Sequence, residues 1–116
     1  MKLAIIGSRF LCDIIIDAYI PSNVSEIVSG GAKGIDLLAK NYASRKGIAY
    51  TEFLPNYKLY GRGAPIKRNE EIARYADKCI AFWDGSSKGT EYTVNFFKKL
   101  EKQVTVIIFP QKNEQS

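Results

Sequence analysis

Short apolar runs alternate with amphipathic stretches along most of the chain, and this alternation is the main structural signal in the sequence. The apolar runs contain many β-branched residues and are followed by turn residues, which is typical of strands. The stretches between them repeat apolar residues every three or four positions, which is typical of helices packed on a sheet. The pattern predicts strands at Leu3–Ile6, Glu26–Ser29, Ile48–Leu54, Lys78–Trp83 and Val104–Phe109, and helices at Leu11–Ile20, Ile35–Lys46, Ile66–Ala76 and Thr90–Lys102.

The ends of these helices carry start and stop residues. Gly47 follows the second helix in the position of a C-terminal cap, and Pro65 stands where the third helix begins. The first helix has the least regular pattern, because Ile14–Ile16 is a β-branched run. The last turns of the final helix carry three lysines that complement the helix dipole, Lys98, Lys99 and Lys102.

Strands that alternate with helices predict an α/β fold with a parallel sheet covered on both faces. Right-handed crossovers then give a single Rossmann-like, three-layer domain with a five-stranded sheet in the order 3-2-1-4-5. We expect this domain to span residues 1–110 and residues 111–116 to form a polar C-terminal tail. Val104–Phe109 is apolar on both faces yet lies at an edge, so helices or a partner subunit should cover it, which favours a homo-oligomer.

Length and composition fit one ordinary globular domain. The chain has 116 residues, of which 46% are hydrophobic and 25% are charged. No apolar stretch approaches the length of a membrane span, and Arg9, Asp13 and Asp17 interrupt the apolar N-terminal segment before it resembles a signal peptide. We therefore expect a cytoplasmic protein with no membrane partner.

The residue types present limit the possible chemistry. The chain has no histidine, which excludes Ser-His-Asp triads, Cys-His pairs and histidine metal sites. Cys12 and Cys79 are far apart in apolar surroundings, so we expect buried, reduced thiols. Nothing in the sequence calls for a metal or a cofactor. The 17 Lys and Arg residues exceed the 12 Asp and Glu residues, and this net charge of +5 suits a phosphate-bearing partner.

Three glycine-containing loops follow predicted strands one, two and four, and each opens a predicted helix. They read Gly7-Ser8-Arg9, Gly30–Gly34 and Gly85–Thr90. Glycine lets the backbone approach an anion, and the free amides at a helix N-terminus point toward it. The loops predict a phosphate-bearing ligand at the carboxyl end of the sheet, with purely structural turns as the alternative. Neither GxxxxGK[ST] nor GxGxxG is present, which argues against a P-loop ATPase and an ordinary NAD dehydrogenase.

Two charged residues stand out beside these loops. Arg68 shares a helix face with Ile72, so it should point toward the sheet end and clamp an anion; the alternative is a surface pair with Glu71 or another acidic residue. Asp36 can bind backbone amides or a ribose hydroxyl, or simply cap its helix. No catalytic residue is assigned. The candidate ligand-binding residues are Gly7, Ser8, Arg9, Gly30, Gly31, Lys33, Asp36, Arg68, Asn69, Ser87, Gly89 and Thr90.

These residues, taken in order, resemble the SLOG superfamily over about residues 3–109. The resemblance rests on the strings Gly7-Ser8-Arg9, Ser29-Gly30-Gly31-Ala32-Lys33-Gly34-Ile35-Asp36, Arg68-Asn69 and Ser87-Lys88-Gly89-Thr90. The superfamily includes the DNA-processing-protein-A family and the Lonely Guy phosphoribohydrolases, and the closest match is to its small stand-alone members of unknown function. The resemblance implies a Rossmann-like domain that binds a nucleotide-derived ligand, as a sensor or as an enzyme.

The Lonely Guy branch cleaves nucleoside monophosphates with an arginine and the glutamate of a GGxGTxxE motif. Gly89-Thr90 is similar to its GT pair, but Thr93 stands at the position of the glutamate. Glu91 lies about 200° around the helix from that position, so it does not replace it. If the resemblance extends to this N-glycosidic hydrolysis, Glu70 or Asp36 would have to supply the carboxylate.

The DNA-processing branch binds single-stranded DNA, and its SGxAxGID and RN motifs resemble Ser29–Asp36 and Arg68-Asn69. Strand binding requires a basic track with exposed aromatic rings. The alternative is that the two tyrosines of such a track anchor their own loop to the core. The residues available for the track are Tyr57, Tyr60, Arg62, Lys67 and Arg68.

Overall fold

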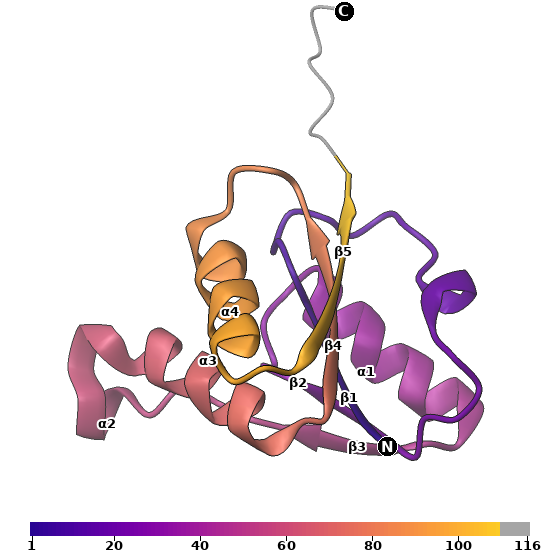
Figure 1. The fold of residues 1–116 in the computed structure, drawn as a ribbon, viewed down its shortest axis with the longest axis horizontal. Coiled ribbons are helices and arrows are strands. Elements are labelled where there is room, and N and C mark those ends of the chain that lie inside the picture. The colour runs from indigo at the N-terminus through magenta and orange to yellow at the C-terminus, as the bar shows by residue number, and fades with distance from the viewer. Residues whose placement is uncertain (110–116) are drawn as a thin grey trace, which may run out of the picture.

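Five strands lie side by side in one parallel sheet, in the order β3-β2-β1-β4-β5 (Figure 1). The computed structural model describes residues 1–109, so the predicted tail at 111–116 lies outside the described residues. The strand order and the parallel pairing confirm the sequence prediction. The strands are β1 (Lys2–Gly7), β2 (Glu26–Ser29), β3 (Ala49–Glu52), β4 (Lys78–Trp83) and β5 (Gln103–Ile108).

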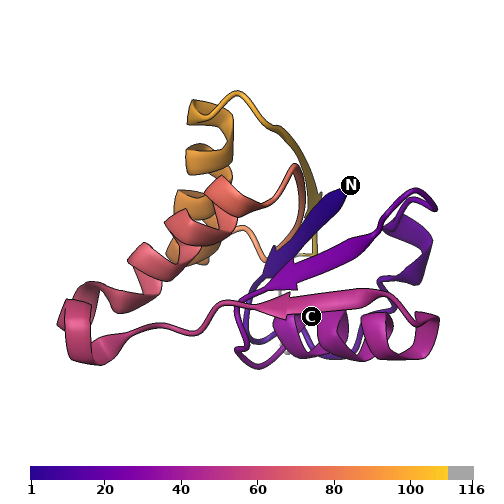
Figure 2. The same ribbon diagram turned by 90° about the horizontal axis from the view of Figure 1, so that it is seen from below.

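Three long helices complete the layers. The helix α1 packs on one face of the sheet, and α3 and α4 pack on the other (Figure 2). Because side chains alternate along β1, Leu3 and Ile5 enter the core beneath α1, whereas Ala4 and Ile6 enter the core beneath α3 and α4. The helices are α1 (Ile35–Lys46), α3 (Ala64–Tyr75) and α4 (Lys88–Lys99).

The predicted helix at Leu11–Ile20 does not form. Residues 8–25 run as an irregular segment whose only helical part is the short 3-10 helix η1 (Asp17–Tyr19). Ile16 is buried in the core, but Ile15 beside it is 79% exposed, so the apolar residues do not share one helical face. The β-branched run favours extended backbone over helix. This segment covers part of the α1 face, where the Tyr19 ring meets Phe82 edge-on at 5.5 Å between centroids.

Helix ends follow the predicted start and stop residues, with one exception. Gly47 adopts the left-handed conformation (φ 65°) and ends α1, and Pro65 lies in the first turn of α3. The helix α4 ends at Lys99, so the prediction that Lys102 belongs to its last turns is wrong. Its ammonium group instead donates hydrogen bonds of 2.7, 2.9 and 2.7 Å to the last carbonyls of α3, at Ala73, Arg74 and Ala76.

A short projecting segment connects β3 to α3 and is here called the arm, residues 55–63. It contains the helix α2 (Tyr57–Tyr60) and the 3-10 turn η2 (Gly61–Gly63), and it stands away from the body of the domain (Figure 1). Tyr57 is 61% exposed and Tyr60 is 40% exposed. The alternative that these tyrosines anchor their loop to the core is therefore wrong.

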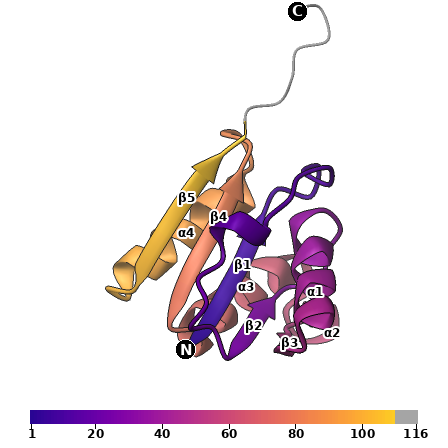
Figure 3. The same cartoon turned by 90° about the vertical axis from the view of Figure 1, so that its right-hand side faces the viewer.

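The strand β5 forms an exposed edge of the sheet (Figure 3). The helices leave Val106 and Ile108 exposed, so they do not protect this strand as one alternative expected. A partner subunit along β5 stays a prediction, and light scattering at rising concentration tests it. Cys79 is buried as expected, but Cys12 is exposed, because the segment that carries it is not helical. Within the described chain, no helix has the length and apolar character of a membrane span.

The contact between Lys102 and the end of α3 predicts a measurable contribution to stability. Lys102→Met keeps the apolar stem but removes the donors to three carbonyl groups. We expect it to lower the free energy of unfolding by about 1–3 kcal/mol in urea denaturation, the range for charged hydrogen bonds. Lys98→Met, on the exposed end of α4, should change it by less than about 0.5 kcal/mol. Equal values for the two variants would contradict the capping role.

Candidate functional site

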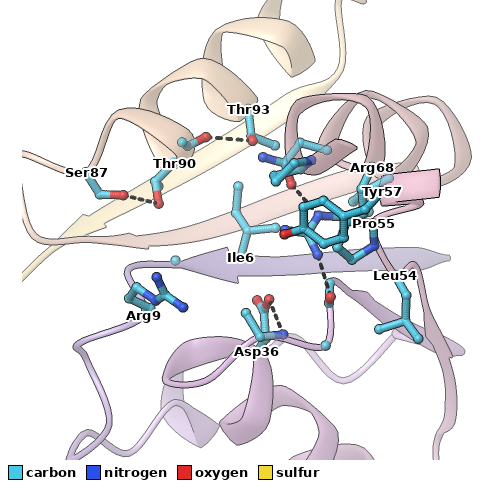
Figure 4. Close-up of a pocket in the computed structure, with 18 residues that line it drawn as sticks. Ile6, Arg9, Asp36, Leu54, Pro55, Tyr57, Arg68, Ser87, Thr90 and Thr93 are labelled. Carbon is cyan, nitrogen blue, oxygen red and sulfur yellow. Dashed lines mark hydrogen bonds between the residues drawn. The ribbon is translucent and has the colours of Figure 1, made fainter. Parts of the chain in front are cut away.

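A cavity of about 400 Å³ opens at the carboxyl end of the sheet, between the N-terminal ends of α3 and α4 and the loops after β1, β2 and β3 (Figure 4). Its volume lies in the range of small-molecule sites. The structure brings all but two of the predicted ligand-binding residues to this cavity; Ser8 and Lys33 do not line it. Those that do are Gly7, Arg9, Gly30, Gly31, Asp36, Arg68, Asn69, Ser87, Gly89 and Thr90.

The loop after β1 is packed tightly against its neighbours. A side chain at Gly7 would collide with the carbonyl oxygen of Phe82 and with the side chain of Ile35, so glycine lets β4 and α1 approach β1. Ser8 is buried, and its hydroxyl oxygen accepts the Asp84 N–H at 3.2 Å instead of facing the cavity. Arg9 is exposed and lines the cavity, and its guanidinium has no hydrogen-bond or ion-pair partner within residues 1–109.

Two glycines in the loop after β2 allow close approach of the Arg9 backbone and of the Arg68 side chain. Gly34 has a positive φ of 72°, and a side chain there would strike the backbone of Arg9, so the first two loops meet backbone to backbone. A Cβ atom at Gly30 would lie 2.6 Å from Nη1 of Arg68. Glycine at position 30 therefore makes space for the arginine, whereas Lys33 is exposed on the outer side of the loop.

Arg68 reaches from α3 to the ends of two strands. Its Nη1 donates to the carbonyl of Gly30 and, at 3.4 Å, to that of Phe53. Its Nε donates to Oδ1 of Asn69 at 2.8 Å. The alternative pairing with Glu71 is therefore not what the structure shows. These bonds hold a positive charge inside the cavity wall and fix α3 to the carboxyl ends of β2 and β3.

Asp36 is a buried carboxyl group, only 8% exposed, in the cavity wall. Oδ2 accepts the Ala32 N–H at 3.1 Å, so it orders the preceding loop and does not cap α1. Oδ1 lies 2.9 Å from the Ser29 hydroxyl oxygen, which also lies 2.8 Å from the carbonyl of Ile5. One hydroxyl proton satisfies only one of these contacts, whereas a protonated Asp36 satisfies both by donating to Ser29. Burial raises the pKa of Asp36. The hydrogen bonds that Asp36 makes with Ala32 and Ser29, together with the nearby charge of Arg68, oppose that rise.

The first turn of α4 supplies polar groups on another side of the cavity. Ser87 and Thr90 place their hydroxyl oxygens 3.3 Å apart, and the Thr93 hydroxyl donates to the carbonyl of Gly89 at 2.8 Å (Figure 4). A Cβ atom at Gly89 would meet nothing within 4 Å, so space remains above the helix start. First-turn amides of a helix lack acceptors within it and carry the positive end of its dipole.

Sequence reasoning missed the apolar side of the cavity. The signal available for it is the tyrosine-rich, proline-flanked segment after β3, in which the sequence predicts a nucleic-acid track or a loop anchored by its tyrosines. Figure 4 places these side chains across the cavity from Arg9 and Ser87. The apolar residues that line the cavity are Ile6, Ala32, Leu54, Pro55, Tyr57, Pro65 and Ile72.

Asp36 is the one carboxylate that lines the cavity within residues 1–109. Glu70 lies outside it and accepts a hydrogen bond from the Tyr92 hydroxyl at 2.5 Å, with Lys67 and Arg74 as ion-pair partners. Glu91 does not line the cavity either. Within the same residues, no cluster of three acidic or cysteine side chains is arranged to hold a metal ion.

Comparisons with protein-family models, curated proteins and solved structures find no match to this chain. The fold and the cavity therefore rest on the observed topology and contacts, and the resemblance to the SLOG superfamily remains an expectation.

The surroundings of Asp36 predict opposite effects for two substitutions. Asp36→Asn retains an acceptor for Ala32 and gains a donor for Ser29, so unfolding at neutral pH should cost as much free energy as in the wild type, or more. Asp36→Ala leaves the Ala32 amide unpaired and should lower the free energy of unfolding by about 1–3 kcal/mol. Urea denaturation measures both.

The pH dependence of the free energy of unfolding shows in which direction the pKa of Asp36 is shifted. The pKa of folded Asp36 lies above its ordinary value of 3.8, so the folded state binds the proton first as pH falls. As pH falls from the pKa of the folded state to that of the unfolded state, the free energy of unfolding of the wild type therefore rises relative to that of Asp36→Asn. Parallel pH profiles for the two proteins would show that the carboxyl group is not perturbed.

Proposed function

We propose that this cavity binds a nucleotide or nucleotide-derived small molecule through its phosphate, as a sensor or as an enzyme, in keeping with the resemblance to the SLOG superfamily. The observation that carries the proposal is the convergence of three positive features on one cavity. These are the unpartnered guanidinium of Arg9, the first turn of α4 and the anchored guanidinium of Arg68. Each favours an anion, and together they surround a space of ligand size.

The remaining polar groups suit the rest of such a ligand. Asp36 and Asn69 line the cavity, and the lone pairs that remain on Oδ2 of Asp36 and Oδ1 of Asn69, beside those that accept from Ala32 and Arg68, suit the hydroxyl groups of a sugar. The hydroxyls of Ser87 and Thr90 stand beside the helix start, where they suit phosphate oxygens. The net charge of +5 favours the approach of anions to the protein as a whole.

Arg9 offers the sharper test of phosphate binding, because its side chain has no other role in the described contacts. We expect Arg9→Ala to weaken binding about tenfold to a hundredfold without changing the melting temperature. Calorimetry with nucleoside monophosphates, cyclic nucleotides, ADP-ribose and NAD measures the dissociation constants. Arg68→Ala should weaken binding as well, but it should also lower stability, because Arg68 holds the ends of β2 and β3.

Lys98→Ala is the matched control, since it removes a positive charge from the far end of α4. It should leave affinity unchanged within about twofold. If Lys98→Ala and Arg9→Ala weaken ligand binding equally, the loss of affinity comes from the overall charge of the protein and not from a contact of Arg9. If none of the phosphorylated compounds binds, the three loops are structural turns and the proposal fails.

N-glycosidic hydrolysis of a nucleotide is the second candidate, and the position of Asp36 favours it. In that reaction water adds to the sugar carbon, the bond from that carbon to the base breaks, and the base leaves with a proton. A buried carboxyl with a raised pKa is suited to hold such a proton. The absence of a glutamate at Thr93 means that the reaction would depend on this one carboxyl group.

Release of free base separates the two candidates. Incubation of a nucleoside monophosphate with the wild type should yield free base and ribose 5-phosphate in chromatography if the enzyme reading holds. Asp36→Asn should then lose the reaction at least about a hundredfold while still binding the nucleotide. Binding without any base release in the wild type identifies a binding protein.

A further inference from the structure

We propose that Leu54 and two residues of the arm, Pro55 and Tyr57, form a subsite for a planar base, here called the aromatic platform. This inference rests on the proposed function, because it assigns one end of the same cavity. The platform would place the aromatic part of a mononucleotide opposite the phosphate end.

The platform is apolar surface that the described chain leaves unpaired. Leu54 is 64% exposed and Tyr57 is 61% exposed, although both line the cavity. Other rings meet partners: Phe53 packs edge-on against Tyr75 at 5.4 Å between centroids. Within residues 1–109, the Tyr57 ring has no aromatic or cationic partner, and its hydroxyl has no hydrogen bond. An aromatic face in a cavity wall without a partner is available to a ligand.

Local structure fixes where this ring stands. Tyr57 is the first residue of α2, and Asn56 immediately before it caps that helix by accepting the Leu59 N–H at 3.1 Å. Gly61, with a positive φ of 57°, turns the chain back toward α3 at the other end of α2. The cap and the turn order the arm around the ring, so a ligand would not have to order it.

The two ends of the cavity differ in chemistry in the way that the two ends of a nucleotide differ. Figure 4 shows Arg9, Ser87 and Thr90 on one side and the platform on the other, with Arg68 beside the platform and Asp36 on the wall between the two sides. A phosphate suits the first end, sugar hydroxyls suit the middle, and a base suits the platform. An inorganic phosphate or a sugar phosphate would leave the platform empty.

The composition of the platform also limits its selectivity. Leu54 and Pro55 have no polar side-chain atoms, and Tyr57 offers one hydroxyl group, so little is available to read the hydrogen-bonding edge of a base. Stacking depends on ring area and is tolerant of base identity. The site should therefore accept all common bases and prefer the larger purines only modestly.

The test compares ribose 5-phosphate with AMP, GMP, CMP and UMP by calorimetry, on the wild type and three variants. In the wild type, each mononucleotide should bind roughly fivefold to a hundredfold more tightly than ribose 5-phosphate. Tyr57→Ala should remove most of that advantage and leave ribose 5-phosphate binding unchanged, whereas Tyr57→Phe should retain it. Tyr60→Ala is the matched control, because Tyr60 lies on the same helix but does not line the cavity.

Three results would overturn the platform, and they separate it from the proposed function. Mononucleotides that bind no better than ribose 5-phosphate leave phosphate binding intact but remove the base subsite. Equal losses in Tyr57→Ala and Tyr60→Ala, with tighter binding of a single-stranded oligonucleotide that falls steeply with salt, assign the arm to a nucleic-acid strand instead. Failure of every phosphorylated compound, ribose 5-phosphate included, removes both proposals together. Because Tyr57 is exposed, an unchanged melting temperature shows that lost binding is not lost folding.

Discussion

The hydrogen bonds of the Arg68 guanidinium maintain the shape of the cavity. The guanidinium crosses from α3 to the carbonyl groups at the ends of β2 and β3, and the missing side chain at Gly30 makes the crossing possible. Bonds from a charged donor to backbone carbonyls are strong, because the donor keeps its charge and the acceptors would otherwise remain unpaired. Within residues 1–109, they are the hydrogen bonds that link α3 to the carboxyl end of the sheet. The glycines at positions 7 and 34 add a second constraint, since they bring the loops after β1 and β2 into contact with their neighbours.

The same region carries a stability cost. Asp36 is buried beside Ser29 with a raised pKa, so its charged form is less favourable in the folded protein than in water. An asparagine would meet the same hydrogen-bonding groups without that cost. The carboxyl group therefore makes this part of the cavity wall less stable than an amide of the same shape would.

Much of this architecture was predictable from sequence, because the repeating strand–helix pattern and the right-handed crossover leave few topologies. The three glycine loops were also predictable, since parallel strands carry the loops that follow them to one end of the sheet. Leu11–Ile20 was predicted wrongly, because a short apolar run fits a helix and an extended segment equally well. The orientation of Ser8 depends on its hydrogen bond with the distant Asp84, and the cavity position of Tyr57 depends on where the locally ordered arm stands relative to the loops after β1 and β2. No local pattern encodes such contacts.

Because Lys102 binds the last carbonyl groups of α3, this helix is capped only after most of the chain has been synthesised. The helix that bears Arg68 receives its last hydrogen-bond donor from a residue 26 positions beyond Ala76, after β4 and α4 have been made. A chain emerging from the ribosome therefore exposes an uncapped α3 until nearly all of the domain has been synthesised. A fragment that stops before residue 102 contains every residue that lines the cavity but lacks this cap and the strand β5. The cavity should thus reach its final shape late in synthesis, when β5 pairs with β4.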